Sequence, residues 1–324
     1  MLRFRTRRTA TAVAASALLL AACAGGDEDT DDTAQAPDEQ LSVFVASYDL
    51  AVGDEQRLLT GVITADAAQI AFGEVTFDVG PVDEDGGVET RDTAPARFLP
   101  VLGLEPDGEG DEPRLLVGES GRGVYEGSVT FDEPGVWGVQ VTVDLDDGTT
   151  RTGVAAFEVA EEPELPSPGD DAPRTVNLTL DDVESGEAEP VSLDSRAQGD
   201  DPEVPDTHLH DTTIADAIEA GDPLVVVVST PTYCATAFCG PLTEELGELA
   251  FDYEDRATFV HLEVWRDFEA RELNAGAAEW IQPASGAGGN EPWVFLVDDE
   301  GTITARWDNV VDRDALIEEL DALV

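Results

Sequence analysis

The sequence predicts a two-domain protein, an all-β sandwich followed by an α/β domain. In residues 41–160, short runs with alternating apolar residues are separated by dense turn signals such as Asp83–Gly87 and Asp146–Gly148, a pattern typical of antiparallel sheets. From residue 207 onward, apolar strands alternate with segments of helical spacing, which is typical of α/β folds. With 324 residues, of which 42 % are hydrophobic, the chain is long enough for two cores.

The N-terminal segment, residues 1–22, resembles a bacterial lipoprotein signal peptide. A start with four arginines precedes the apolar run Thr9–Leu20, which ends in Leu20-Ala-Ala-Cys23. That run is too short to span a membrane as a helix. The resemblance implies removal of residues 1–22 and lipidation of Cys23, so that the protein is anchored to the cell membrane on the extracytoplasmic side. An ordinary secretory signal or a short anchor is the alternative. Residues 23–40 are acidic and predict a disordered tether.

The charge of the chain limits its partners. There are 71 acidic residues and 17 basic ones, and every basic residue is an arginine. Repulsion therefore excludes nucleic acid and anionic lipid surfaces as partners, apart from the contact made by the lipid on Cys23. Either adaptation to a salty exterior or an ordinary acidic exported protein explains this composition.

Residues 41–160 resemble an immunoglobulin-like β-sandwich in the number and length of their strands. The segment contains no histidine and no cysteine, so no catalytic role is expected for it. Trp137 is expected in the core. The predicted strands are Ser42–Ser47, Leu58–Thr64, Ala71–Val79, Arg97–Leu102, Val124–Phe131, Val136–Asp144 and Gly153–Val159.

Residues 161–206 form an acidic, proline-rich linker and a segment whose structure is ambiguous. Residues 207–324 form the α/β domain. Its predicted strands are Leu224–Ser229, Phe259–Trp265, Trp293–Val297 and Thr302–Trp307, and its predicted helices are Thr212–Ala220, Pro241–Phe251, Phe268–Trp280 and Asp312–Leu323. Asp312 has the residue type of a helix N-cap.

The stretch Cys234-Ala-Thr-Ala-Phe-Cys239 is the main candidate for chemistry. It lies between the strand Leu224–Ser229 and a helix that is expected to start at Pro241. A thiolate at a helix N-terminus is stabilised by the unpaired amides and the helix dipole. Once Cys23 carries lipid, Cys234 and Cys239 are the two thiols left in a compartment that permits disulfides, so we expect them to form one.

This element order, with the cysteines after the first central strand and Glu291-Pro292 before a hairpin, resembles the thioredoxin fold family over residues 207–324. The resemblance implies a cis Glu291–Pro292 bond and thiol–disulfide exchange. Cys234 would attack a substrate disulfide, Cys239 would resolve it, and Pro292 would present its backbone to the substrate. The family spaces its cysteines by two residues, not four. It also has a buried acid where this chain has Val228, and Glu263 is a weaker substitute for that acid.

The copper-binding Sco branch of the same fold is also similar, because its cysteines are more widely spaced and are followed by proline, as in Cys239-Gly-Pro241. That branch needs a late histidine, and no histidine follows His261. His208 and His210 could face a metal together, but exposed, idle histidines are the more common case. His261 is expected to be a hydrogen-bonded core residue. We therefore assign no metal ligand and expect no cofactor.

The sequence thus predicts a membrane-tethered thiol–disulfide oxidoreductase with an unidentified protein thiol or disulfide partner. Two alternatives stay open. One is a non-catalytic binding lipoprotein in which the Cys234–Cys239 bond is structural, and the other is Sco-like binding of a soft metal such as copper.

Overall fold

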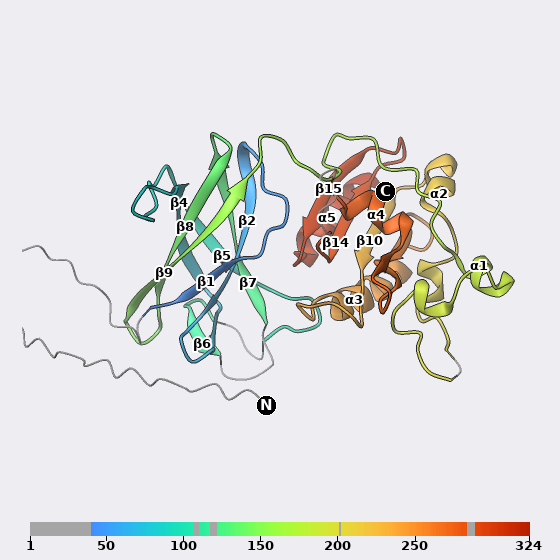
Figure 1. The fold of residues 1–324 in the computed structure, drawn as a ribbon, viewed down its shortest axis with the longest axis horizontal. Helices are drawn as coiled ribbons and strands as arrows, with labels where there is room; N and C mark the ends of the chain where they lie inside the picture. The colour runs from blue at the N-terminus through green and yellow to red at the C-terminus, as the bar shows by residue number, and fades with distance from the viewer. Residues whose placement is uncertain (1–39, 107–109, 117–121, 201, 284–288) are drawn as a thin grey trace, which may run out of the picture. The chain divides into compact units, whose positions relative to one another are not determined.

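The computed structural model describes residues 40–324 except for 107–109, 117–121, 201 and 284–288 (Figure 1). The predicted signal peptide, Cys23 and the tether up to residue 39 lie outside the described residues. Within the described ranges, no helix combines the length and the apolar character needed to cross a membrane.

In the described part of residues 42–159, nine strands form one antiparallel sheet with the order β6-β3-β2-β7-β5-β4-β8-β9, and β1 pairs with β2. Alternate residues of these strands face an apolar core that contains Phe77, Tyr125 and Trp137. The strands are β1 (Ser42–Val45), β2 (Gly53–Ile63), β3 (Gln69–Ala71), β4 (Glu74–Pro81), β5 (Asp92–Pro100), β6 (Arg114–Leu116), β7 (Gly123–Phe131), β8 (Gly135–Asp144) and β9 (Thr150–Val159).

The prediction of an immunoglobulin-like sandwich is wrong, because these strands do not divide into two separate sheets. Strand β7 pairs with β2 along one edge and with β5 along the other, so hydrogen bonding continues from β6 to β9. Alternation and turn signals locate strands, but they do not specify which edges pair. Trp137 is a core residue, as predicted, and its indole N–H donates to the carbonyl of Glu133 at 2.9 Å.

The segment assigned to the linker, residues 161–206, contains structure that the sequence did not indicate. It includes helix α1 (Leu180–Ser185) and the 3-10 turn η1 (Pro190–Ser192), and it is followed by η2 (Thr207–Leu209). The amide of Ala172 donates to the carbonyl of Gly301 at 2.9 Å, and Asp194 and Ser195 are fully buried. The segment therefore packs against the C-terminal part of the chain.

A separate four-stranded mixed sheet has the order β11-β10-β14-β15. Its strands are β10 (Leu224–Ser229), β11 (Thr258–Glu263), β14 (Trp293–Val297) and β15 (Ile303–Asp308). Strand β10 is parallel to β11 and antiparallel to β14. The four helices beside this sheet are α2 (Ile214–Ala220), α3 (Cys239–Asp252), α4 (Ala275–Ile281) and α5 (Arg313–Leu323).

Both faces of this sheet are covered, which explains the uninterrupted valines of β10. Val226 and Val228 face a core that includes residues of α2 and α4, whereas Val225 and Val227 face a core that includes residues of α3 and α5. All six residues of β10 are buried. The strand is therefore a rigid base for the turn that follows it.

The prediction of an α/β thioredoxin-like domain is also wrong. Of the described residues, 37 % lie in strands and only 19 % in helices, and the separate mixed sheet does not establish a thioredoxin fold. The helix predicted for Phe268–Trp280 starts only at Ala275. The preceding residues instead form the hairpin of β12 (Trp265–Asp267) and β13 (Glu272–Leu273), because Arg271 adopts a left-handed backbone conformation, φ 57°, that a helix cannot continue through.

Candidate functional site

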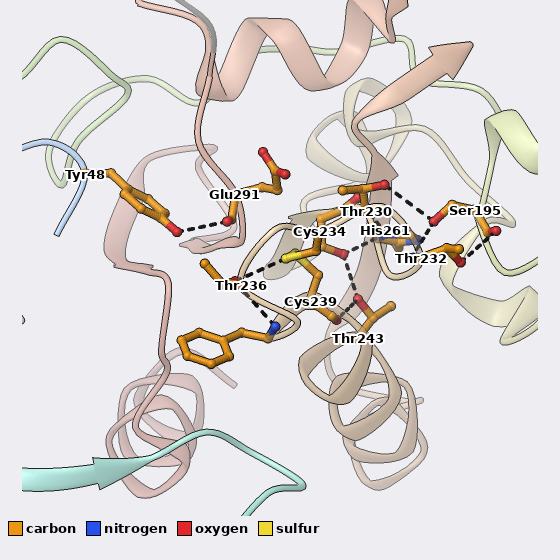
Figure 2. Close-up of a disulfide and its surroundings, with 12 residues drawn as sticks. Tyr48, Ser195, Thr230, Thr232, Cys234, Thr236, Cys239, Thr243, His261 and Glu291 are labelled. Atoms are coloured by element: carbon orange, nitrogen blue, oxygen red, sulfur yellow. Dashed lines mark hydrogen bonds between the residues drawn. A yellow bond between two sulfur atoms is a disulfide. The ribbon is translucent and has the colours of Figure 1, made fainter. Parts of the chain in front are cut away.

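The two cysteines of the turn between β10 and α3 form a disulfide, as the sequence predicts (Figure 2). Their α-carbons are 6.0 Å apart, within the ordinary range for a disulfide. The amide of Cys234 donates to the carbonyl of Thr230 at 3.1 Å, and Ala237 takes a left-handed conformation with φ 60°. The turn reverses tightly between the cysteines and so brings them together.

The two cysteines differ in exposure. Cys239 is fully buried and is the first residue of α3, two residues before the expected start at Pro241. Pro241 fits within the first turn because amides there have no partner inside the helix. Cys234 is half-buried, and its sulfur lies 3.2 Å from the hydroxyl of Thr236. Cys234 is therefore the more accessible of the two cysteines.

A row of hydroxyl groups leads from the start of α3 into the sheet. The hydroxyl of Thr243 donates to the carbonyl of Cys239 at 2.8 Å, and it lies 2.6 Å from the hydroxyl of Ser229. Ser229 in turn lies 2.9 Å from Nε2 of His261 (Figure 2). These buried contacts fix the N-terminal turn of α3 to β10 and β11.

Glu263 ends β11 and is 2 % exposed. Its carboxylate accepts hydrogen bonds from the amides of Ser195 (2.8 Å) and Trp265 (3.1 Å). Burial raises the pKa of Glu263 to about 7, in spite of these hydrogen bonds. Among its described contacts none is with a cysteine sulfur, so its part as a proton acceptor for the cysteines remains a prediction.

Ser195 connects Glu263 to the cysteine turn, a contact that the sequence analysis did not predict. Its hydroxyl accepts from the amide of Thr232 at 3.0 Å, and its carbonyl accepts from the hydroxyl of Thr232 at 2.9 Å. Ser195 belongs to the segment whose structure the sequence leaves ambiguous, 37 positions before Thr232, and no periodic pattern marks it. Such a contact is visible only in the folded chain.

The Glu291–Pro292 peptide bond is cis, as predicted. Pro292 is buried at the start of β14, and its carbonyl accepts from the amide of Asn309 at 2.8 Å. The carbonyl of Glu291 accepts from the hydroxyl of Tyr48 at 2.9 Å (Figure 2). Burial raises the pKa of both Tyr48 and Glu291. That Pro292 presents its backbone to a substrate remains a prediction.

Of the three histidines, His261 is a buried, hydrogen-bonded core residue, as expected, whereas His208 and His210 do not face the same place. His208 lies against Phe251, and its Nε2 is 2.9 Å from the carbonyl of Gly247. His210 does not share its surroundings. It is buried beside His261 and Asp194, and one donor atom from each of these three residues lies within 4.8 Å of the others. Of the described residues, this trio has the arrangement that could hold a metal ion.

A cavity of about 610 Å³ lies beside the cysteine turn. Thr236 and Phe238 of the turn line it together with Phe44 and Val62 of the nine-stranded sheet and with Tyr48, which lies between β1 and β2. Because Thr236 also contacts the sulfur of Cys234, the cavity adjoins the more accessible cysteine. Its lining is mainly apolar, which suits an uncharged side chain of a protein better than an ion.

Neither a known protein family nor any curated protein matches this chain.

Proposed function

We propose that the protein carries out thiol–disulfide exchange through Cys234 and Cys239, with a protein thiol or disulfide as its partner. The proposal rests on the difference in exposure between the two bonded cysteines. Cys234 is half-buried in an irregular turn, whereas Cys239 is fully buried at the first residue of α3. Exchange requires a sulfur that a partner can reach, and a buried second sulfur restricts the attack to the accessible one.

In the reducing direction, the Cys234 thiolate attacks one sulfur of a substrate disulfide. The Cys234–substrate bond forms, and the second substrate sulfur leaves as a thiolate that takes up a proton. The Cys239 thiolate then attacks the Cys234 sulfur, which forms the Cys234–Cys239 bond and releases the first substrate sulfur. Two electrons pass from the cysteine pair to the substrate, and the reverse sequence oxidises a substrate dithiol.

The surroundings of the turn support this assignment. The hydroxyl row Thr243–Ser229 holds the Cys239 end in place, and Ser195 holds Thr232 on the Cys234 side. The cavity lined by Thr236 and Phe238 offers an apolar site next to Cys234 for a side chain that flanks a substrate cysteine. Because the turn is held in place and the apolar cavity lies next to Cys234, a substrate disulfide is expected to approach Cys234 from the side of the cavity.

Trapping of mixed disulfides tests the proposal. Cys239→Ser is expected to accumulate mixed disulfides with partner proteins because the resolving sulfur is absent. The matched variant, Cys234→Ser, is expected to trap few or none, since Cys239 is buried. Complexes are counted on non-reducing gels and identified after release with a dithiol reductant.

Two outcomes would contradict the proposal. Equal trapping by both variants would show that the roles of the two sulfurs are not distinct. No trapping, together with a Cys234–Cys239 bond that resists reduction by glutathione, would show that the disulfide is structural and that the protein is a non-catalytic binding protein.

We further propose that the mature protein is held on the extracytoplasmic face of the cell membrane by lipid on Cys23. The basic start, the apolar run and Leu20-Ala-Ala-Cys23 support this assignment. Cys23→Ser is expected to release the protein into the medium or to leave it unprocessed, as followed by membrane fractionation and the mass of the N-terminal peptide. A Cys23→Ser protein of processed size that stays on the membrane would contradict the lipid assignment.

A further inference from the structure

Three buried side chains from separate segments meet behind the cysteine helix. Asp194 follows η1, His210 follows η2, and His261 lies in the middle of β11. They are 0 %, 1 % and 2 % exposed. Nδ1 of His261 is 3.6 Å from Oδ2 of Asp194, and Nε2 of His210 is 3.8 Å from the same oxygen. Both distances are longer than a hydrogen bond.

The hydroxyl row determines which nitrogen of His261 carries its proton. Thr243 has one hydroxyl proton, which it donates to the carbonyl of Cys239. Ser229, 2.6 Å from Thr243, must therefore donate its own proton to Thr243. The hydroxyl of Ser229 is left as an acceptor for His261, so Nε2 of His261 is the donor at 2.9 Å. In a neutral imidazole, Nδ1 then has a lone pair and no proton.

That lone pair faces a carboxylate. Arg196 donates to both oxygens of Asp194, from Nε at 3.0 Å and from Nη2 at 2.7 Å, and these bonds hold the carboxylate in place. Nδ1 of His261 has no hydrogen-bond partner among the described residues, and 3.6 Å is too long for a proton shared with Asp194. Two acceptors that face each other without a proton between them repel, and a cation between them removes the repulsion.

The ring of His210 also lacks hydrogen-bond partners. Neither of its ring nitrogens has a hydrogen-bond partner, and Nδ1 of His261 has none either. Buried ring nitrogens without partners are costly, and native proteins rarely leave them so. One nitrogen of each ring and one carboxylate oxygen lie within 4.8 Å of one another, so a single buried ion could serve as the partner of all three residues.

We propose that Asp194, His210 and His261 bind a divalent first-row transition metal ion of the zinc class. Two imidazole nitrogens and one carboxylate oxygen are donors that such ions prefer. Donor atoms about 2.1 Å from a tetrahedral ion are about 3.4 Å apart, slightly closer than the distances here. The bond from Nε2 of His261 to Ser229 supplies the outer contact that usually orients a metal-bound imidazole.

The neighbouring charges accommodate such an ion. Arg196 is the nearest cation, and it is also paired with Asp206 at 2.8 Å. Asp206 therefore offsets the charge of Arg196, and the charge of Asp194 is left for the metal. The ion would join the segment around Asp194 and His210 to β11, which is a structural role independent of the thiol chemistry proposed above.

Zinc binding by the oxidised full-length protein tests this site. Equilibrium dialysis in excess Ca²⁺, which occupies surface carboxylates, is expected to leave one Zn²⁺ per chain and to raise the melting temperature. The same stoichiometry is expected in a Cys23→Ser/Cys234→Ser/Cys239→Ser variant, which excludes the thiols. Co²⁺ should give the visible absorption of a four-coordinate site.

Matched variants locate the ion. His210→Gln removes no hydrogen bond of the ring, and it should weaken zinc binding by roughly a hundredfold and abolish the Co²⁺ absorption. Ser229→Ala should weaken zinc binding by roughly 10- to 100-fold through the orientation of His261. His208→Gln should bind zinc as the parent does. Equal binding by His210→Gln and His208→Gln, or no zinc retained in excess Ca²⁺, would overturn the proposal. A crystal structure of the zinc-treated protein that shows a water molecule and no anomalous signal between Asp194, His210 and His261 would also overturn the proposal, because a buried water would then be the common partner.

Discussion

At the scale of single residues, the candidate site combines an accessible sulfur of Cys234 with buried polar groups such as Glu263. Glu263 is a buried acid at the end of β11, and the backbone amides of Ser195 and Trp265 donate hydrogen bonds to its carboxylate. These donors favour the charged form, but desolvation is the larger effect, so the pKa rises to about 7. Protonation of Glu263 is therefore coupled to folding.

The stability of the protein is expected to fall between about pH 4.5 and pH 7 because of Glu263. Its folded pKa, about 7, lies above the ordinary value of 4.5, so its contribution to stability is full below pH 4.5 and is lost as the pH rises through 7. The loss is at most about 3 kcal/mol. Denaturant unfolding at several pH values should show that Glu263→Gln lacks this decline. A parallel pH profile for the parent and the variant would contradict the assignment.

At the scale of elements, β10 and α3 fix the position of the cysteine turn. All six residues of β10 are buried, and the inner face of α3 contributes Leu242, Leu246 and Leu249 to the core on one side of the sheet. The regular spacing of these leucines is what indicates the helix in the sequence. The core contacts, rather than the turn itself, keep Cys239 buried.

Leu246→Ala is expected to destabilise the protein by about 2–5 kcal/mol, because Leu246 is 0 % exposed and its truncation leaves a cavity under α3. Glu248→Ala, on the exposed side of the same helix, should change stability by less than about 0.5 kcal/mol. Guanidinium unfolding measures both variants with the disulfide intact. Similar losses in the two variants would mean that α3 does not pack through Leu246.

At the scale of the whole molecule, the main electrostatic feature is the excess of acidic residues. The net charge is −54, and repulsion among so many carboxylates opposes the compact state. The described residues offset part of it with arginine pairs such as Arg57–Asp308 and Arg306–Asp49, both at 2.8 Å. Because the chain has 71 acidic residues and only 17 arginines, most of its carboxylates cannot each be paired with an arginine.

Added salt is therefore expected to stabilise the protein. The screening length shortens from about 10 Å at 0.1 M to about 3 Å at 1 M, so the melting temperature should rise over this range. At low ionic strength, sodium chloride and sodium perchlorate should act alike, because screening depends on ionic strength rather than on the nature of the anion. A melting temperature that is independent of salt, or that falls in both salts, would contradict this account of the acidity.

Much of the local structure was predictable. The strand Leu224–Ser229 and the strand Trp293–Val297 match the structure residue for residue, and Asp312 caps α5 by accepting from the amides of Asp314 and Ala315. The disulfide was also predictable, since few cysteines leave few pairings. These features depend on neighbours in the sequence, where propensity and spacing act directly.

The arrangement of strands and the buried polar groups were decided only by the tertiary structure. Nothing local determines that β7 pairs with both β2 and β5, so the expected sandwich became one sheet. His210 was expected at the surface and lies in the interior, because its partners, Asp194 and His261, are separated from it by many residues. By itself, the sequence determined the cysteine pair, the acidity and most strand positions. Which charges and rings share a buried space was decided by long-range packing, since desolvation depends on every segment that excludes water from that space.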